Sequence, residues 1–319
     1  MQNNSLLRRR SLLAGLAVLA TPHPGRAAGV LRVATLKATN DLALAKAHGS
    51  LERALAAIGT GIEWSGPFAA AAPAAEALAA GAVDLTVGSS TSFVTSRAAG
   101  VKLVMFAAQR LSPAGEAIVV QGSSRARSIT DLAGGGVAVN RGGTGEYLLV
   151  RAMARAGMAP DSVKRIYLGP ADARAAFAAG AVEGWAIWDP FLSMAVQAGA
   201  KVLADGAQCG SENAVAYFVS PGVLAANRPA VETVLRVLRQ ENAWAAAHAN
   251  EAGALWAREL GLPASLGPRL GRNNTPPIGP VGAEQAAQVE HIADWYVENR
   301  IVPARPDIAG FLVDLSAAS

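Results

Sequence analysis

Short apolar strands that alternate with helices, through turns of small residues, constrain the fold of this chain more than any other sequence feature. Strands are expected at 31–36, 83–87 and 137–140, where apolar residues form short runs. Helices are expected to follow, for example at 41–58 and 146–156. Strands that alternate with helices build parallel sheets covered on both faces. The sequence therefore predicts an α/β fold.

Two such units follow each other, and a mainly helical tail closes the chain. The units span roughly residues 30–110 and 115–215, and each has the size of an ordinary domain. No internal sequence repeat is visible. We therefore expect two lobes joined by crossovers near 110 and 218, built from three segments: 29–112 as the first part of lobe 1, 113–218 as lobe 2, and 219–319 as the helical return to lobe 1.

The first 28 residues have the features of an export signal. Three arginines, Arg8 to Arg10, precede an apolar run at 12–20, and prolines and small residues follow. A basic patch, a short apolar core and a small-residue exit are typical of such signals, and the run is too short to span a bilayer. The arginines followed by Leu12 and Leu13 also fit a twin-arginine signal. We expect residues 1–28 to be removed on export to the periplasm.

The charge of the chain changes when this segment is removed. The whole sequence has 28 lysines and arginines against 24 aspartates and glutamates. Residues 1–28 contain four arginines and no acidic residue, which leaves 24 basic and 24 acidic residues in the rest. A balanced chain without a basic, aromatic-rich stretch gives no sign of nucleic-acid binding, so we expect none.

Polar and small residues gather at four places where a predicted strand ends. Ligands of open α/β sheets bind beyond the carboxyl ends of the strands, so these junctions are candidate binding segments. They are Lys37 with Thr39 and Asn40, Gly88 to Ser92, Arg141 to Gly145, and Trp188 to Pro190.

The junctions share the chemistry of an anion site. The first N–H groups of a helix have no partner within the helix, and the helix dipole places partial positive charge there. Serine and threonine hydroxyls add donors, and Lys37 adds a full charge. A sulfonate suits a site that offers only donors, because it is ionised at neutral pH, whereas a carboxylate in the site would repel it. A small ionised anion is therefore the expected ligand.

Each junction also has a plain structural interpretation. A single hydroxyl- or glycine-rich turn is in most cases a helix cap. Trp188 can form an apolar wall for a ligand or pack in the core beside Trp185. Asp189 can contact the ligand or cap the next helix, in which Pro190 would take the first position. Glu146 is interpreted as a first-turn helix residue that faces solvent.

No pattern of an enzyme, a metal site or a cofactor site stands out. His48, His248 and His291 lack the spacing of metal ligands, so no metal is expected. The turn at 142–145 is not a complete dinucleotide fingerprint and lacks a phosphate-loop lysine, so no cofactor is expected. Cys209 is the only cysteine, which excludes an intramolecular disulfide.

Residues 167–191 carry the most specific family resemblance. They read YLGPADARAAFAAGAVEGWAIWDPF. This stretch resembles the periplasmic aliphatic sulfonate-binding proteins, which are relatives of the taurine and nitrate binders. Supporting pieces of the same resemblance are Leu31 to Lys37, Gly81 to Gly88, Ile129 to Gly134 and Tyr296 to Pro303.

The resemblance implies a two-lobed type II periplasmic binding protein fold, each lobe a mainly parallel sheet flanked by helices. It implies that lobe closure captures an alkanesulfonate for the permease and ATPase subunits of an ABC importer, for sulfur acquisition when sulfate is scarce. We expect a monomer and not an enzyme. The residues implied by the resemblance, together with Thr39 of the first junction, form the predicted ligand-binding set: Lys37, Thr39, Ser89, Ser90, Thr91, Gly143, Thr144, Trp188 and Asp189.

Two loops depart from the family pattern. Gly88 to Ser92 stand where we expect Gly-Ser-Thr-Gly-Asp, and Arg141 to Thr144 stand where we expect Lys-Gly-Ser-Ser. The ligand therefore stays open among alkanesulfonates, taurine, nitrate and aromatic sulfonates. Desulfinases of this fold, which release sulfite from aryl sulfinates, are a separate alternative that needs a nucleophilic cysteine in the cleft. Cys209 is distant in sequence from every junction.

Overall fold

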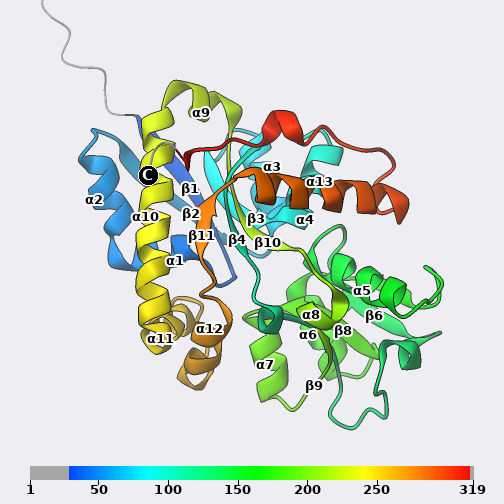
Figure 1. Cartoon of the computed structure of the whole chain (residues 1–319). Helices are drawn as coiled ribbons and strands as arrows, with labels where there is room; N and C mark the ends of the chain where they lie inside the picture. Colours follow the sequence, from blue (N-terminus) through cyan, green and yellow to red (C-terminus); the bar gives the residue numbers. More distant parts are fainter. Residues whose placement is uncertain (1–28, 317–319) are drawn as a thin grey trace, which may run out of the picture.

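The computed structural model describes residues 29–316, which form two mixed sheets flanked by helices (Figure 1). The predicted export signal at 1–28 lies outside the described residues. None of the helices within 29–316 is long and apolar enough to cross a membrane. The sheet of lobe 1 consists of β1 (Val30–Leu36), β2 (Gly61–Phe68), β3 (Leu85–Ser89), β4 (Val104–Arg110), β10 (Ala214–Val219) and β11 (Ile278–Pro280).

The helices of lobe 1 come from both ends of the described chain: α1 (Asp41–His48), α2 (Ser50–Ala56), α3 (Ala71–Ala79), α4 (Ser90–Ala98), α9 (Pro221–Ala226), α10 (Arg228–Ala247), α11 (Ala249–Glu259), α12 (Gly267–Asn273) and α13 (Ala283–Glu298). Lobe 2 is continuous in sequence. It consists of β5 (Glu116–Val120), β6 (Gly136–Val139), α5 (Thr144–Arg155), β7 (Lys164–Tyr167), α6 (Pro170–Ala178), β8 (Gly184–Trp188), α7 (Phe191–Gln197), β9 (Lys201–Asp205) and α8 (Gly206–Cys209).

Both sheets have the same core strand order, although the sequence shows no repeat. The first sheet runs β2-β1-β3-β10-β4-β11, and the second runs β7-β6-β8-β5-β9. In each sheet the strand that enters from the other lobe, β10 or β5, is antiparallel to both of its neighbours. An entering strand starts at the lobe boundary and runs away from it, whereas its neighbours run toward it. The predicted α/β fold is confirmed, with sheets that are mixed rather than mainly parallel.

The second crossover comes earlier in the chain than the sequence predicted. β10 begins at Ala214 and pairs with β3 and β4 of the first sheet, so the expected boundary at 218 is wrong. The chain leaves the second sheet after Asp205 and reaches lobe 1 through α8 and residues 210–213. A strand belongs to the sheet that provides its partners, and these partners are distant in sequence.

The helix expected at 41–58 is two helices that meet at Gly49. This residue has a φ of 64°, a left-handed conformation that glycine adopts without a steric penalty. Its N–H bonds to the carbonyls of Ala45 and Lys46 and so closes α1. The chain then turns directly into α2.

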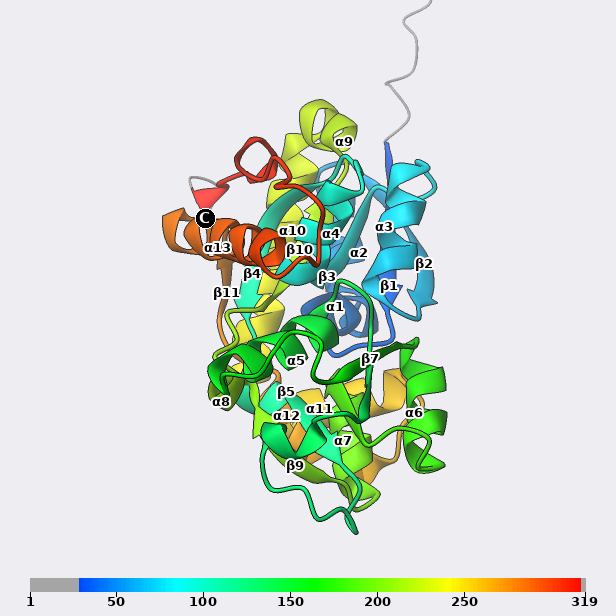
Figure 2. The same ribbon diagram turned by 90° about the vertical axis from the view of Figure 1, so that its right-hand side faces the viewer.

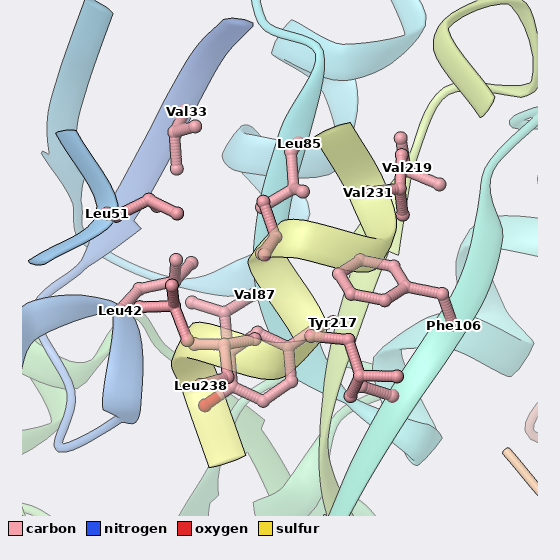
Figure 3. Close-up of a cluster of buried hydrophobic side chains, with 14 of the residues drawn as sticks. Val33, Leu42, Leu51, Leu85, Val87, Phe106, Tyr217, Val219, Val231 and Leu238 are labelled. Carbon is pink, nitrogen blue, oxygen red and sulfur yellow. The ribbon is translucent and has the colours of Figure 1, made fainter. Parts of the chain in front are cut away.

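The tail returns to lobe 1, and its longest helix completes the core of that lobe. Apolar residues of α10 recur at intervals of three and four positions, which places them on one face of the helix. Val231 and Leu238 of this face pack with Leu42 of α1 and with Val87 and Tyr217 of the sheet (Figure 3). The helix thus supports the strands whose ends face lobe 2.

Aromatic side chains join the two lobes at the start of α5. Tyr147 lies in a buried cluster of lobe 1, with its ring centre 5.2 Å from that of Trp295 and 5.8 Å from that of Tyr296. The Tyr296 hydroxyl donates to the carbonyl of Gly142 at 3.3 Å. Figure 2 shows α5 at the boundary between the upper and lower lobes. These contacts hold the first turn of α5 against lobe 1.

The free energy of unfolding is expected to fall as the pH rises from about 4 to about 7, in part through Asp41. This carboxyl is fully buried at the start of α1, and burial raises its pKa to about 7. The unfolded-state value is about 3.9. Between these values the native state keeps a proton that the unfolded state has lost, so stability that is present at low pH is lost as the pH rises through the folded-state pKa.

The variant Asp41→Asn should therefore show a weaker fall in stability between about pH 4.5 and about pH 8 in denaturant unfolding. Burial also raises the pKa of Glu116 to about 7, so a residual fall should remain in the variant. Equal slopes for the variant and the unmodified protein would contradict the contribution of Asp41.

Candidate functional site

A cavity of about 400 Å³ lies between the two lobes, at the ends of their strands. Residues of lobe 1, residues of lobe 2 and Asn274 of the tail line it. Most of the predicted binding residues meet here, although they come from distant parts of the sequence: Lys37, Thr39, Ser89, Gly143, Thr144, Trp188 and Asp189.

Five helices within residues 29–316 begin at the cavity and give it a positive electrostatic character. The free N–H groups of each helix and the positive end of its dipole favour an anion. The sequence predicted this chemistry for α1, α4 and α5, but not for α3 and α6, which start without a hydroxyl or amide side chain. The N-cap residues that line the cavity are Asn40, Ala70, Ser89, Gly143 and Gly169.

Among the described residues, two cationic side chains line the cavity, one from each lobe. Lys37 follows β1 and Arg141 follows β6, both are exposed, and neither forms an ion pair within residues 29–316. The guanidinium carbon of Arg141 lies 3.6 Å from the centre of the Tyr167 ring. Stacking of this kind orients the guanidinium plane and leaves its N–H groups free for an anion. Arg141 and Tyr167 were not in the predicted binding set.

Glu146 does not face solvent, so its sequence interpretation is wrong. The side chain is buried, and Oε2 accepts from the N–H of Gly142 at 2.7 Å. Oε1 accepts from the Tyr167 hydroxyl at 2.7 Å and from the Arg165 guanidinium at 3.3 Å. Glu146 thus anchors the turn before α5 and the ring on which Arg141 stacks. Its partners on β7 are set by tertiary packing, which sequence spacing does not show.

The start of α4 is closed by a reciprocal cap. The Ser89 hydroxyl accepts from the N–H of Ser92 at 3.1 Å, and the Ser92 hydroxyl accepts from the N–H of Ser89 at 2.9 Å. This capping box satisfies two otherwise free donors. Both side chains also line the cavity, so the cap and the candidate site share the same residues.

Asn213 connects the lobes behind the cavity and explains the positions of Ser90 and Thr91. Its Oδ1 accepts from the Ser90 hydroxyl at 2.9 Å and from the N–H of Thr91 at 3.4 Å. Its Nδ2 donates to Oγ1 of Thr144 at 2.9 Å. Ser90 and Thr91 are buried in this junction and do not line the cavity. Thr144 accepts from Asn213 and keeps its own hydroxyl hydrogen for a ligand.

Asp189 lines the cavity, but its oxygens are already bonded within the protein. Oδ1 accepts from the N–H and the hydroxyl of Ser193 at 2.9 and 2.6 Å. Oδ2 accepts from the amides of Asn273 and Asn274 at 2.9 and 3.2 Å. The Thr39 hydroxyl donates to Oδ1 of Asn274 at 2.7 Å. Burial raises the pKa of Asp189, and its contacts match the structural interpretation, that of a cap for α7.

The position of Trp188 is compatible with both interpretations that the sequence left open. It lines the cavity, and its ring also lies edge-on to Phe191, 6.2 Å between centres, on the core of lobe 2. Pro190 lies just before α7 rather than at its first position. Asn274 was missed because no sequence signal links the tail to the strand ends. Asn140 ends the strand predicted at 137–140 and Arg141 follows it, so both could have been included.

The family model described as NMT1/THI5 like matches residues 67–252. The match covers more than half of the chain and includes three of the junctions that line the cavity. The chain belongs to the NMT1/THI5-like family. Membership accounts for the resemblance at 167–191, which lies within the matched range.

Comparison with solved structures agrees with this assignment. The periplasmic aliphatic sulphonate binding protein SsuA from Escherichia coli is 33% identical, with a TM-score of 0.79 over 89% of this chain and 92% of that one. The alkanesulfonate-binding protein SsuA from Xanthomonas axonopodis pv. citri, bound to MOPS, is 30% identical, with a TM-score of 0.83 over 91% and 99%. The desulfurization enzyme DSZB, at 14% identity and a TM-score of 0.65 over 90% and 97%, shares the fold alone.

Proposed function

We propose that this protein is an extracytoplasmic solute-binding protein that captures an alkanesulfonate between its lobes and delivers it to an ABC importer. The cavity is the main support for this proposal. In the part of the chain that the structure describes, five helix N-termini and two cations without ion-pair partners face it, while Asp189 is fully bonded to internal donors. Donors without a free carboxylate match an anion that has no proton to donate. The sulfonate-binding relatives support the same ligand class.

The ligand is expected to contact both lobes. The sulfonate would accept hydrogen bonds from Lys37 and Ser89 of lobe 1 and from Arg141 and Thr144 of lobe 2, all of which line the cavity. Trp188 would contact the alkyl chain. A ligand that is bound from two sides favours the closed arrangement of the lobes, because it interacts with both only in that state.

The cavity favours an alkanesulfonate over taurine and nitrate. Taurine carries an ammonium group, and the described lining residues include no free carboxylate to balance it, because Asp189 is already bonded. Nitrate is small and fully polar, so it would leave most of the 400 Å³ and the apolar wall at Trp188 without contacts. An aromatic sulfonate has the same head group and remains within the proposed class.

Binding is favoured over desulfinase-like catalysis by the position of Cys209. Its thiol is buried at the end of α8, does not line the cavity, and has a pKa that burial raises to about 12. A thiolate is the nucleophilic form of cysteine. A cysteine that stays protonated and away from the cavity does not supply the nucleophile that such an enzyme needs.

We also propose that residues 1–28 direct export to the periplasm and that the mature protein is a monomer. In its liganded form it would dock on a permease that is driven by ATPase subunits. The periplasmic location given for the Escherichia coli relative supports the export proposal.

Thermal unfolding with a ligand panel tests the proposed function. A ligand at about a thousand times its dissociation constant stabilises the native state by about 4 kcal/mol, so a short alkanesulfonate should raise the unfolding temperature clearly. Taurine, nitrate and sulfate at the same concentration are the controls, and an aryl sulfonate tests the breadth of the class. A response to nitrate alone, with none to any sulfonate, would refute the ligand assignment.

A further inference from the structure

A neighbouring side chain, and not the backbone conformation, requires a glycine at position 143. Its φ of −114° and ψ of −163° are extended values that any residue adopts. It is the N-cap of α5, a position where serine, threonine, aspartate and asparagine are preferred. A Cβ at this position would overlap Nδ2 of Asn140. The side chain of Asn140 therefore occupies the space that an N-cap side chain would fill.

Asn140 also makes the hydrogen bond that an N-cap side chain would normally make to the first turn of α5. Its Oδ1 accepts from the N–H of Gly145, the second residue of α5, at 2.7 Å. This bond fixes the orientation of the amide, because only the oxygen can accept from an N–H. The NH2 group consequently lies on the side of Gly143.

The NH2 group of Asn140 is free to bind a ligand. Asn140 lines the cavity, together with Arg141 and Thr144. Its Oδ1 has the partner named above, whereas Nδ2 has no hydrogen-bond acceptor within residues 29–316. A neutral amide with two N–H donors beside a helix N-terminus adds donors without adding a counter-charge.

We propose that Asn140 is a specificity-determining residue, whose Nδ2 donates to the anionic group of the ligand at the start of α5. The assignment rests on the proposed function and extends it to a residue outside the set predicted from the sequence. The side chain has two roles that are separable by mutation: Oδ1 caps the helix, and Nδ2 binds the anion. An aspartate at 140 would keep the acceptor and replace the donor by a second negatively charged oxygen.

The variant Asn140→Asp tests the donor role. Because the bond to the N–H of Gly145 can persist, the unliganded unfolding temperature should stay near that of the unmodified protein. Affinity for hexanesulfonate, measured by calorimetric titration, should fall about 100-fold or more through lost donation and like-charge repulsion. Asn250→Asp, an exposed position on α11 outside the cavity, is the control for the change in net charge and should bind normally.

A compensating pair separates binding from capping. Asn140→Ala should weaken hexanesulfonate binding about 10-fold or more and lower the unfolding temperature, because α5 loses its cap. Adding Gly143→Ser to Asn140→Ala places a hydroxyl in the vacated space, which can cap α5 and donate to the ligand, so both properties should recover in part. Gly143→Ser alone should weaken binding, since it displaces the Asn140 amide.

The outcomes distinguish this assignment from the proposed function. If Asn140→Asp is folded and binds hexanesulfonate as well as the unmodified protein, the donor role is wrong and the proposed function stands. If Asn140→Ala is less stable but binds hexanesulfonate as well as the unmodified protein, Asn140 is a cap only. If the unmodified protein binds no sulfonate, the proposed function and the role of Asn140 are both wrong.

Discussion

Replacing Trp256 by alanine is expected to lower the free energy of unfolding by about 3–5 kcal/mol. The side chain is fully buried among Leu44 of α1 and Leu266 and Leu270 near α12. Its Nε1 also donates to the carbonyl of Asn40 at 3.0 Å. The substitution would leave a large cavity and remove a hydrogen bond to a buried carbonyl, and each of these changes destabilises the native state.

The substitution should also disturb the ligand site, because Asn40, which loses its bond to Trp256, is the N-cap of α1 and lines the cavity. Denaturant unfolding measures the stability, and Trp256→Phe separates the two causes. The phenylalanine ring keeps most of the packing and removes the N–H donor, so we expect an intermediate loss of about 1–3 kcal/mol.

Trp244→Ala is the matched control, since Trp244 is a half-buried tryptophan on α10 whose ring stacks on His248. Its removal should cost clearly less than that of Trp256, because less of its surface is withdrawn from water. If both alanine variants lower the free energy of unfolding equally, the buried cluster around Trp256 does not contribute the extra stability that we assign to it.

Arg141→Glu is expected to reduce alkanesulfonate affinity by about 100-fold or more, with little effect on the unliganded protein. A hydrogen bond to a charged group contributes about 1.5–3 kcal/mol, and a carboxylate at this position would in addition repel the anion. The guanidinium is exposed, stacks on Tyr167 and has no ion-pair partner among the described residues. Its loss therefore leaves no buried charge uncompensated.

Calorimetric titration with hexanesulfonate measures this effect, and thermal unfolding without ligand checks the fold. Arg174→Glu is the matched control: Arg174 is exposed on α6 of the same lobe and does not line the cavity. It makes the same change in net charge and should leave affinity within about threefold, since an exposed charge that does not contact the ligand is screened by solvent and salt. A similar loss for both variants would indicate a general charge effect instead of a contact by Arg141.

Thr144 illustrates how far a residue could be assigned from its sequence context. Its place after a strand and two glycines predicted a helix start near an anion, and it does line the cavity at the start of α5. Its bond with Asn213, from a crossover far along the chain, was not predictable. Thr91 had an equally favourable context, yet it is buried against the same Asn213 and does not reach the cavity.

The sequence by itself determined the order of strands and helices, because strand and helix periodicity and N-cap chemistry act within a few residues. It also placed Lys37, Ser89 and Thr144 at strand ends, which meet at one edge of an α/β sheet. The tertiary structure alone decided which strand joins which sheet, as β10 shows. It also buried Glu146, bonded every oxygen of Asp189 and brought Asn274 to the cavity. These outcomes depend on partners that are distant in the chain, and local propensity carries no information about such partners.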